Sequence, residues 1–381
     1  MSEPMNDFDF DHLIDRQGTW SDKWSKYAGT DILPMWVADT DFRSPQAVID
    51  ALKTRVDHGV FGYTRTPETL NQLFSERMQR LYNWTVSDED LVWLPGLVCG
   101  LNLATRALST AEQSVITAQP IYPPFMSSPA LSSRALITIP MKGRVIDFDA
   151  LEEAITAETR LLLFCNPHNP GGGVYRHEEL ERLAQIIIDQ DLLICSDEIH
   201  CDLILQPELQ HTPIASLSEE IASRTVTLMA PSKTWNIAGL ACSVAIIQNP
   251  ELRARFKKVR KGIVPDVNLL GYTAAEAAYS QGDEWNRKQC EYLKGNRDYL
   301  ISEIGKIPGL SMLPNEATYL AWIDANQLGV DSPQQLFESQ GVGLSDGEDF
   351  GAPGFVRLNF GCPRSRIEEA VRRMKLAVDS L

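Results

Sequence analysis

Short apolar runs alternate with turns and amphipathic stretches through the middle of the chain. Runs bounded in this way are typical of strands that are buried on both faces of a parallel sheet. Apolar residues at helical spacing between two of the runs predict a βαβ unit; they are Leu180, Leu183, Ala184, Ile187 and Ile188. The predicted strands are 91–94, 114–117, 136–139, 161–165, 192–195 and 225–229, and the four from 114 to 195 should be fully buried. We expect an α/β fold with helices on both faces of a mostly parallel sheet.

The segments before this region have other patterns. Residues 1–45 show little periodicity but many aromatic residues, which predicts an N-terminal arm that packs on the small domain and the site. Residues 46–82 have a helical pattern around a break at 59–64, a loop that presents Tyr63. After the strand at 91–94, a Pro-Gly turn leads into a largely apolar helix at 97–108.

The pattern changes again after residue 240. A long charged helix at 285–307 ends at a Pro-Gly pair and predicts a connection to a second domain. Strands at 318–323 and 354–361, flanked by helices near 332–341 and 365–380, predict a smaller α+β domain. The expected organisation is an arm at 1–45, a large domain at 46–284 and a small domain at 285–381.

Composition narrows the possible partners and compartment. The 381 residues are 44% hydrophobic and 23% charged, contain no apolar stretch that could span a bilayer, and carry a net charge of −16. Nucleic-acid binders need a basic face, so we expect neither a nucleic-acid partner nor a membrane role. The acidic first residues lack the pattern of a signal peptide, and we expect a cytoplasmic protein. Seven cysteines with no Cys-x-x-Cys pair favour reduced thiols over disulfides or a metal site.

Polar residues follow four of the predicted strands, at the edge where open α/β sheets place their ligands. Tyr122 follows 114–117, Asn169 lies in the loop after 161–165, and Lys233 follows 225–229. Asp197 and His200 both follow 192–195. Each has a structural alternative as a turn residue, a helix cap, a satisfied core histidine or a packed aromatic. Their shared position at the carboxyl ends of strands favours a common site.

Lys233 is the residue around which this chemistry can be built. A lysine amine whose pKa is lowered traps carbonyl groups, and a Schiff base with pyridoxal phosphate is the commonest use of such a lysine. The glycine turn before the helix at 97–108 offers backbone N–H groups to a phosphate, although such a glycine is often only a turn. Arg357 lies on an alternating strand and is either a surface charge or a receptor for a carboxylate.

These motifs resemble the pyridoxal-phosphate-dependent enzymes of fold type I. General features of class I/II aminotransferases are Asn169-Pro170, Ser196-Asp197-Glu198, Ser232-Lys233 and the arginine of Val356-Arg-Leu-Asn-Phe360. Other segments are more specific and resemble the branch that contains cystathionine β-lyase and related C–S lyases. They are 16–24, 35–42, Phe61-Gly-Tyr-Thr64, Ser196-Asp-Glu-Ile-His200 and Lys233-Thr-Trp-Asn-Ile-Ala-Gly239.

The resemblance implies a role for each residue that matches a motif. Lys233 would carry the cofactor, Asp197 would pair with its ring nitrogen, and Tyr122 would stack on its ring. Ile199 would pack beneath the ring, while Asn169 and His200 would bond its phenolic oxygen. The phosphate would be bound by the amides of Leu97 and Val98, the hydroxyl of Ser232, and Tyr63 from a second subunit. Arg357 would bind the substrate carboxylate, with Ala38 and Asp39 close by on the arm.

Two positions depart from the family pattern. Ala241 stands where many aminotransferases have a phosphate-binding arginine, and Gly171 replaces the threonine of Asn-Pro-Thr-Gly, which should loosen that turn.

The resemblance implies a homodimeric C–S β-lyase that acts on a small sulfur amino acid. An aminotransferase is the alternative, and a cofactor-binding protein that contacts a regulatory partner is a third possibility.

Overall fold

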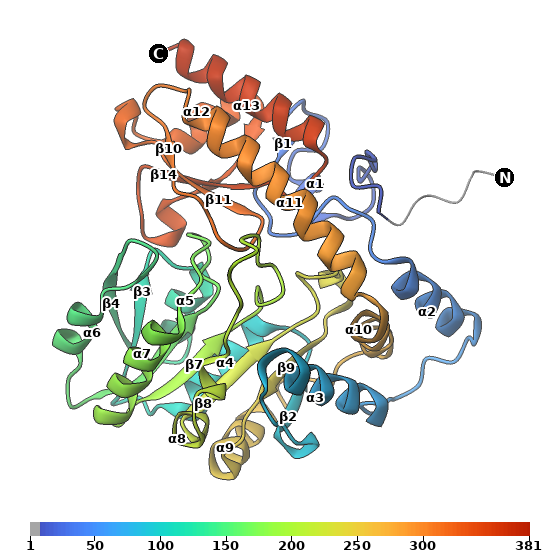
Figure 1. Ribbon diagram of the computed structural model, residues 1–381, viewed down its shortest axis with the longest axis vertical. Coiled ribbons are helices and arrows are strands. Elements are labelled where there is room, and N and C mark those ends of the chain that lie inside the picture. Colours follow the sequence, from blue (N-terminus) through green and yellow to red (C-terminus); the bar gives the residue numbers. More distant parts are fainter. Residues whose placement is uncertain (1–7) are drawn as a thin grey trace.

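The chain is built on a large eight-stranded sheet that spans the lower part of Figure 1. The computed structural model describes residues 8–381, so the expectation about the first residues of the chain lies partly outside it. The strand order is β2 (Leu91–Leu94), β9 (Ser243–Ile246), β8 (Thr225–Met229), β7 (Leu193–Asp197), β6 (Thr159–Cys165), β3 (Ser114–Gln119), β4 (Ala135–Lys142) and β5 (Val145–Ile146). From β8 to β4 all neighbours are parallel, which confirms the mostly parallel sheet, and β9 runs antiparallel to both its neighbours.

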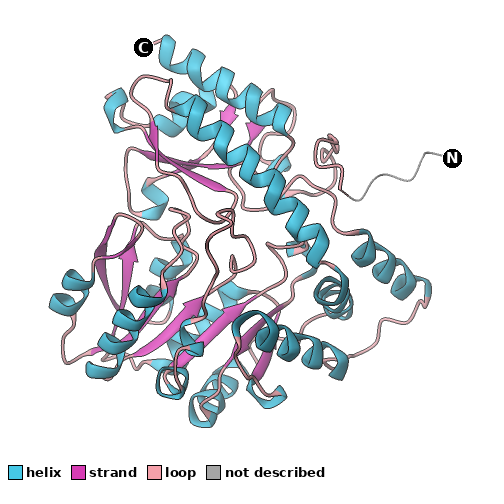
Figure 2. Cartoon of the chain, viewed as in Figure 1, coloured by secondary structure: helices cyan, strands magenta, loops and turns pink. Residues whose placement is uncertain are grey.

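Helices cover both faces of this sheet (Figure 2). The face that shares a core with Leu101 and Phe256 carries α4 (Leu97–Leu108), α5 (Pro123–Leu131) and α9 (Pro250–Arg260). The other face carries α6 (Phe148–Ala154), α7 (His177–Asp189) and α8 (Glu219–Ser223), and beside β2 and β9 it carries α3 (Glu68–Tyr82) and α10 (Leu269–Gln281). Helix α2 (Gln46–Asp57) packs on α10. The sheet is therefore the middle layer of three.

One of the four strands expected to be fully buried is not. Within β4 only Ile139 is buried, and the other residues are half-buried or exposed. The reason is its place in the sheet, since only the two-residue strand β5 separates β4 from the end. An apolar run of this length cannot reveal how far a strand lies from the sheet edge.

A smaller antiparallel sheet lies above the large one in Figure 1. Its order is β10 (Ser311–Met312), β11 (Leu320–Asp324), β14 (Phe355–Asn359) and β13 (Ser345–Asp346). The helices α11 (Asp283–Ile304), α12 (Pro333–Ser339) and α13 (Arg364–Asp379) pack with it. The 3₁₀ helices are η1 (Asp88–Asp90), η2 (Ile214–Ser216), η3 (Ala238–Leu240), η4 (Asn326–Leu328) and η5 (Glu348–Phe350).

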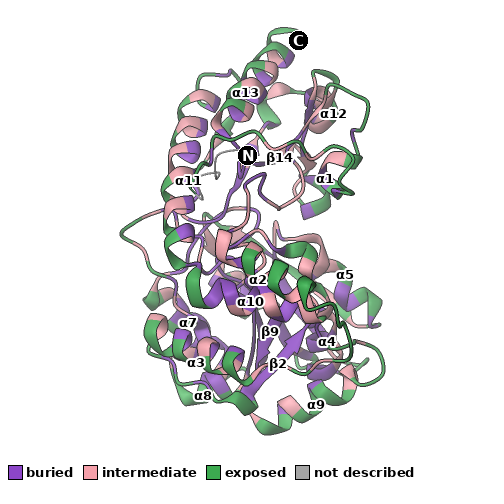
Figure 3. Cartoon of the chain, turned by 90° about the vertical axis from the view of Figure 1, so that its right-hand side faces the viewer, coloured by how far each residue is buried: buried purple, intermediate pink, exposed green. Residues whose placement is uncertain are grey.

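The described part of the N-terminal segment runs along the small sheet. It contains α1 (Asp22–Ser25) and β1 (Leu33–Pro34), and β1 pairs in parallel with β12 (Val342–Gly343). Phe10 and Phe42 are buried with their ring centroids 5.0 Å apart, whereas Trp20 is 96% exposed. The side view in Figure 3 shows buried residues concentrated along the large sheet and where the helices face it. Among residues 8–381, no helix has both the length and the apolar composition to cross a membrane.

Candidate active site

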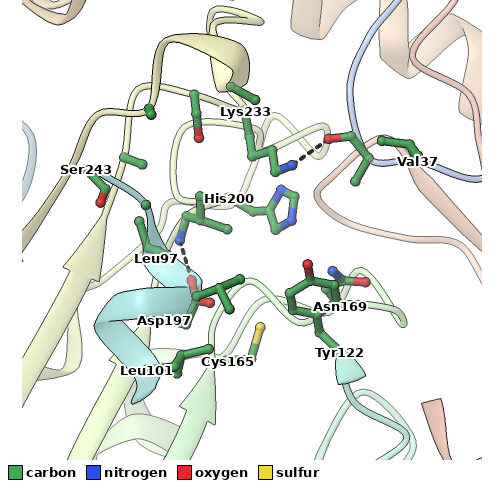
Figure 4. A pocket seen from close by; sticks show the side chains of 18 of the residues that line it. Val37, Leu97, Leu101, Tyr122, Cys165, Asn169, Asp197, His200, Lys233 and Ser243 are labelled. Atoms are coloured by element: carbon green, nitrogen blue, oxygen red, sulfur yellow. Dashed lines mark hydrogen bonds between the residues drawn. The ribbon is translucent and has the colours of Figure 1, made fainter. Parts of the chain in front are cut away.

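A cavity of about 410 Å³ opens at the carboxyl ends of β6, β7 and β8, where the arm and the small sheet meet the large sheet (Figure 4). It gathers side chains that are far apart in the sequence. The predicted site residues that line it are Ala38, Leu97, Val98, Tyr122, Asn169, Asp197, Ile199, His200, Ser232, Lys233 and Arg357. The structure therefore brings eleven of the predicted residues into one cavity.

Lys233 follows the end of β8 and points into this cavity. Its Nζ donates a hydrogen bond of 2.6 Å to the carbonyl oxygen of Ala38, which also accepts one of 3.1 Å from the Tyr319 hydroxyl. Burial lowers the pKa of Lys233 from 10.5 to about 8, and Arg357 contributes in the same direction. About a tenth of the amine is therefore neutral at pH 7 and about half at pH 8, and the neutral form is the one that acts as a nucleophile or base.

Asp197 is the last residue of β7 and is buried at the opposite wall from Lys233 (Figure 4). One carboxylate oxygen, Oδ1, accepts a hydrogen bond of 3.1 Å from the amide of Ile199. Burial, and to a smaller extent the neighbouring Glu198, raises the pKa of Asp197 to about 7. No cationic side chain within residues 8–381 forms an ion pair with this carboxylate. It is thus prepared for a positively charged partner.

Arg357 lies in the middle of β14 and is 5% exposed, which excludes its reading as a surface charge. Its Nη1 donates to Oδ1 of Asn169 at 3.0 Å, and its Nη2 donates to the carbonyl oxygen of Trp36 at 2.9 Å. Burial lowers the pKa of Arg357 to about 10, so the guanidinium is charged near neutral pH. Nη2 also donates to the Ser345 hydroxyl at 3.3 Å. Because all these acceptors are neutral, they leave a full positive charge available to an anion.

His200 and Tyr122 flank the centre of the cavity. His200 is buried, and no residue of the described chain bonds its Nδ1. Burial lowers the pKa of His200 to about 3, and Lys233 and Arg357 act in the same direction, so the ring is neutral. Tyr122 caps α5, and its amide donates to the carbonyl oxygen of Asn169 at 3.2 Å. This bond ties the backbone of Tyr122 to the Asn169 turn.

The turn at Asn169 is bonded to the neighbouring His168 ring. That Gly171 loosens this turn stays a prediction. The Gly171 amide donates to His168 Nδ1 at 3.2 Å, and the other ring nitrogen, Nε2, lies 3.0 Å from the carbonyl oxygen of Pro120. A Cβ on Gly171 would lie 2.9 Å from His168 Nδ1, so glycine gives the ring this room.

The amino end of α4 faces the cavity. The helix begins after Gly96, no side chain caps it, and Leu97 and Val98 of its first turn line the cavity. A free helix N-terminus favours an anion through its N–H groups and its dipole. Ala241 also lines the cavity and contributes no charge, and Lys233 and Arg357 are the only lysine or arginine among the lining residues.

Two predicted residues do not line the cavity of their own chain. Asp39 forms a two-fold ion pair with Arg16, with one contact of 2.7 Å and one of 3.2 Å. Tyr63 is fully exposed on the loop between α2 and α3, where a role in a neighbouring subunit's site stays a prediction.

The sequence did not predict some residues that line the cavity or that hold the arm beside it. Trp36 contributes its carbonyl oxygen to Arg357, and Asn236 ties the arm down through bonds to Thr40 and Phe42. Asn236 lies in the same sequence motif as Lys233, so the sequence carried a signal for it. Trp36 acts through its backbone carbonyl oxygen, which no pattern of side chains can indicate. Asp22, Cys165 and Ser243 also line the cavity. The described chain contains no group of three or more His, Cys, Asp or Glu side chains that could hold a metal ion.

Comparison with known proteins places this geometry in a family. The family model for aminotransferase class I and II matches residues 31–374. The chain belongs to the aminotransferase class I and II family. Its fold is the predicted fold type I of pyridoxal-phosphate-dependent enzymes.

Several known proteins are similar to this chain over nearly its full length. Cystathionine beta-lyase PatB of Bacillus subtilis (strain 168) is 36% identical, over 97% of this chain and 99% of its own. The crystal structure of OvoB has 52% identity and a TM-score of 0.96, with 98% and 99% of the two chains covered. Cystalysin from Treponema denticola, whose crystal structure contains pyridoxal 5'-phosphate, has 31% identity and a TM-score of 0.93, with 98% and 99% covered.

Proposed function

We propose that the protein is a pyridoxal-phosphate-dependent C–S β-lyase that cleaves a small sulfur amino acid into a thiol, pyruvate and ammonia. The observation that carries the proposal is the cavity in which Lys233, with its lowered pKa, faces the unpaired carboxylate of Asp197. The choice of elimination over amino transfer is supported by the similarity to cystathionine beta-lyase PatB and to the C–S lyase from Staphylococcus hominis.

The lining residues fit pyridoxal phosphate at each of its polar positions. The open N-terminus of α4 and the Ser232 hydroxyl would hold the phosphate, and Asp197 would hold the ring nitrogen. The unpartnered Nδ1 of His200 and the amide of Asn169 would hold the phenolic oxygen. Tyr122 and Ile199 would pack on the two ring faces. When bound, the cofactor supplies a carbonyl that condenses with amines and a ring that withdraws an electron pair.

Three residues of the chain would handle the substrate. Arg357 would bind the α-carboxylate through its planar fork, in exchange for the carbonyl oxygen of Trp36. Lys233, once released from Ala38, would take the proton from the substrate Cα, for which a pKa of about 8 is well matched. Asp197 would keep the ring nitrogen protonated, which the withdrawal of electrons requires. The Cβ–S bond then breaks, and the sulfur leaves as a thiolate.

The experiment supplies L-cystathionine without any keto acid and follows pyruvate and free thiol together. Each substrate and one water should give one thiol, one pyruvate and one ammonia over many turnovers. A reaction that stops after one turnover and resumes on addition of 2-oxoglutarate would replace the lyase with an aminotransferase, the activity for which the matching family is named.

The proposal includes a homodimer in which Tyr63 completes the partner's site. Val56, Val60 and Phe61 precede Tyr63 in the sequence and are about half exposed, and a second copy would cover these apolar side chains. We also propose the division into an arm at 1–45, a large domain at 46–284 and a small domain at 285–381. The enzyme would work in the cytoplasm, where its seven unpaired thiols stay reduced.

A further inference from the structure

The ring of His168 lies between two segments that supply residues of the active-site cavity. His168 is 4% exposed and does not line this cavity, whereas its sequence neighbour Asn169 does. Its Nε2 lies 3.0 Å from the carbonyl oxygen of Pro120, two residues before Tyr122. Its Nδ1 accepts a hydrogen bond of 3.2 Å from the amide of Gly171, two residues after Asn169. The ring therefore joins the segment of Tyr122 to the turn of Asn169.

The two partners of the His168 ring determine where its proton lies. The Gly171 amide can only donate, so Nδ1 is the nitrogen without a proton. The Pro120 carbonyl can only accept, so Nε2 carries the proton. Burial lowers the pKa of His168 to about 4, in agreement with a neutral ring near pH 7. This one neutral form of the ring makes both hydrogen bonds at once.

Asn169 is the residue of the turn that faces the cofactor in the proposed function. Its Oδ1 accepts a hydrogen bond of 3.0 Å from Nη1 of Arg357, and no described residue accepts one from its Nδ2. Its backbone carbonyl oxygen accepts from the amide of Tyr122 at 3.2 Å, and the two side chains lie side by side in Figure 4. The direction of the remaining Nδ2 donor depends on the position of the turn, and a hydrogen bond weakens steeply when its donor is tilted away.

We propose that His168 is a positioning residue, which holds the Asn169 turn so that the Asn169 amide points at the phenolic oxygen of the cofactor. The inference rests on cofactor binding in the proposed function and is independent of the reaction that follows. Pro120 anchors the ring, and Gly171 is the point at which the ring holds the turn. In this role His168 acts on the cofactor only through Asn169.

Two substitutions separate the two hydrogen bonds of the ring. The side-chain oxygen of asparagine is as many bonds from Cα as Nδ1 of histidine, so His168→Asn keeps an acceptor for Gly171 and loses the donor to Pro120. The side-chain nitrogen of glutamine is as many bonds from Cα as Nε2, so His168→Gln keeps the donor to Pro120 and loses the acceptor at the Nδ1 position. Each variant is thus the matched control for the other.

The test measures the dissociation constants of pyridoxal phosphate and of 3-deoxypyridoxal phosphate, which lacks the phenolic oxygen, near neutral pH and without substrate. The ratio of the second constant to the first reports what the phenolic oxygen contributes to binding, and in the wild type it should be about ten or more. His168→Gln should lower this ratio about fivefold, because the Asn169 amide is no longer held in line with the phenolic oxygen. His168→Asn should keep the ratio within about twofold of the wild type.

A double variant shows whether His168 acts through Asn169. Asn169→Ala should lower the ratio by itself, and adding His168→Gln to it should not lower the ratio further. A purely structural role of His168 predicts weaker binding of both compounds with an unchanged ratio, and that result would overturn the inference. Equal ratios in His168→Gln and His168→Asn would overturn it as well.

Nitrogen NMR of the wild type, with isotope-labelled histidine, tests the same geometry if His168→Gln does not fold. The chain has six histidines, and the ring signals of His168 are those that disappear in His168→Asn. At pH 7 they should show a proton on Nε2 and none on Nδ1. A proton on Nδ1, or on both nitrogens, would contradict the hydrogen bond to Gly171 and overturn the inference.

The binding measurement also separates this inference from the proposed reaction. A wild-type protein that binds no pyridoxal phosphate would overturn both. Cofactor binding with the predicted ratios, but no release of pyruvate from cystathionine, would support the role of His168 and overturn only the lyase.

Discussion

Replacing Asp41 with asparagine should release the arm that covers the active site. Asp41 is buried, and four donors converge on its carboxylate. The three cationic ones are Arg16 at 2.7 Å, Lys23 at 3.2 Å and Arg366 at 2.7 Å, and the indole nitrogen of Trp24 lies at 3.1 Å. Lys23 is itself only 1% exposed, so Asp41→Asn leaves a buried ammonium without its nearest full negative charge.

The size of the stability loss in Asp41→Asn follows from two independent arguments. Breaking a buried ion pair on one side costs about 3–5 kcal/mol. The pKa of Asp41 is raised by burial, but Lys23 and Arg366 more than offset this and lower it from 3.8 to about 2. That difference is worth about 2–3 kcal/mol of folding stability, present above about pH 4 and lost as pH falls toward 2. We therefore expect Asp41→Asn to lower the free energy of unfolding by about 3 kcal/mol at pH 7.

The Asp41→Asn substitution should also lower the activity. The segment 36–41 provides the carbonyl oxygens that accept from Lys233 and Arg357, and Asn359 bonds two further carbonyls of this segment. With the charge cluster broken, this segment should fray first, and kcat/KM for cystathionine should fall more than the affinity for pyridoxal phosphate. Both proteins need to be assayed at a temperature at which they are fully folded.

The assay is urea unfolding of the wild type and Asp41→Asn at several pH values between 3 and 8. Asp31→Asn is the matched control, because Asp31 pairs with Arg373 at 3.0 Å while remaining 93% exposed. An exposed pair is worth about 0–1 kcal/mol, so this control should barely change. The stability difference between the wild type and Asp41→Asn should shrink on acidification. A loss in Asp41→Asn no larger than that in the control would refute the reasoning.

Other variants test the cavity itself. Arg357→Lys should raise KM for cystathionine by about tenfold with unchanged cofactor absorbance, because a point charge replaces a planar fork; an unchanged KM would remove Arg357 from the carboxylate site. Asp197→Asn should fold and bind substrate but lose at least about a hundredfold in kcat, since the amide cannot hold the ring nitrogen protonated; full activity would exclude the pairing. Mixing inactive Tyr63→Phe and Lys233→Ala subunits should restore activity, because one of the two sites in a mixed dimer then has both wild-type residues; no recovery, with mixed dimers confirmed by sedimentation, would place both residues in the same chain's site.

The fold could be predicted from the sequence where local pattern determines the structure. The run at 225–229 coincides with β8, and the expected helix at 97–108 coincides with α4, because both have apolar patterns bounded by clear turn residues. The strand β9 was missed, since its four residues follow an irregular segment and pair antiparallel to both neighbours. The exposure of β4 was also not predicted. It depends on the order of the strands in the sheet, and a short stretch of sequence does not reveal that order.

The same distinction holds for the site. Residues at the carboxyl ends of strands, such as Asp197 and Lys233, could be found because parallel strands bring their ends together. The Trp36 carbonyl that engages Arg357 could not be found, because it comes from the arm, whose path is set by tertiary contacts. The hydrogen bond from the His168 ring to the Pro120 carbonyl joins residues 48 positions apart, and no periodicity links them.

The central claim is that Lys233 binds pyridoxal phosphate covalently. Reduction of the cofactor-loaded protein with borohydride, followed by proteolysis and mass spectrometry, measures this directly. The account predicts loss of the visible cofactor absorbance and one pyridoxyl group per chain, located on Lys233, with no label in the Lys233→Ala variant. A label on another lysine, or no label on a protein that binds the cofactor, would contradict the account.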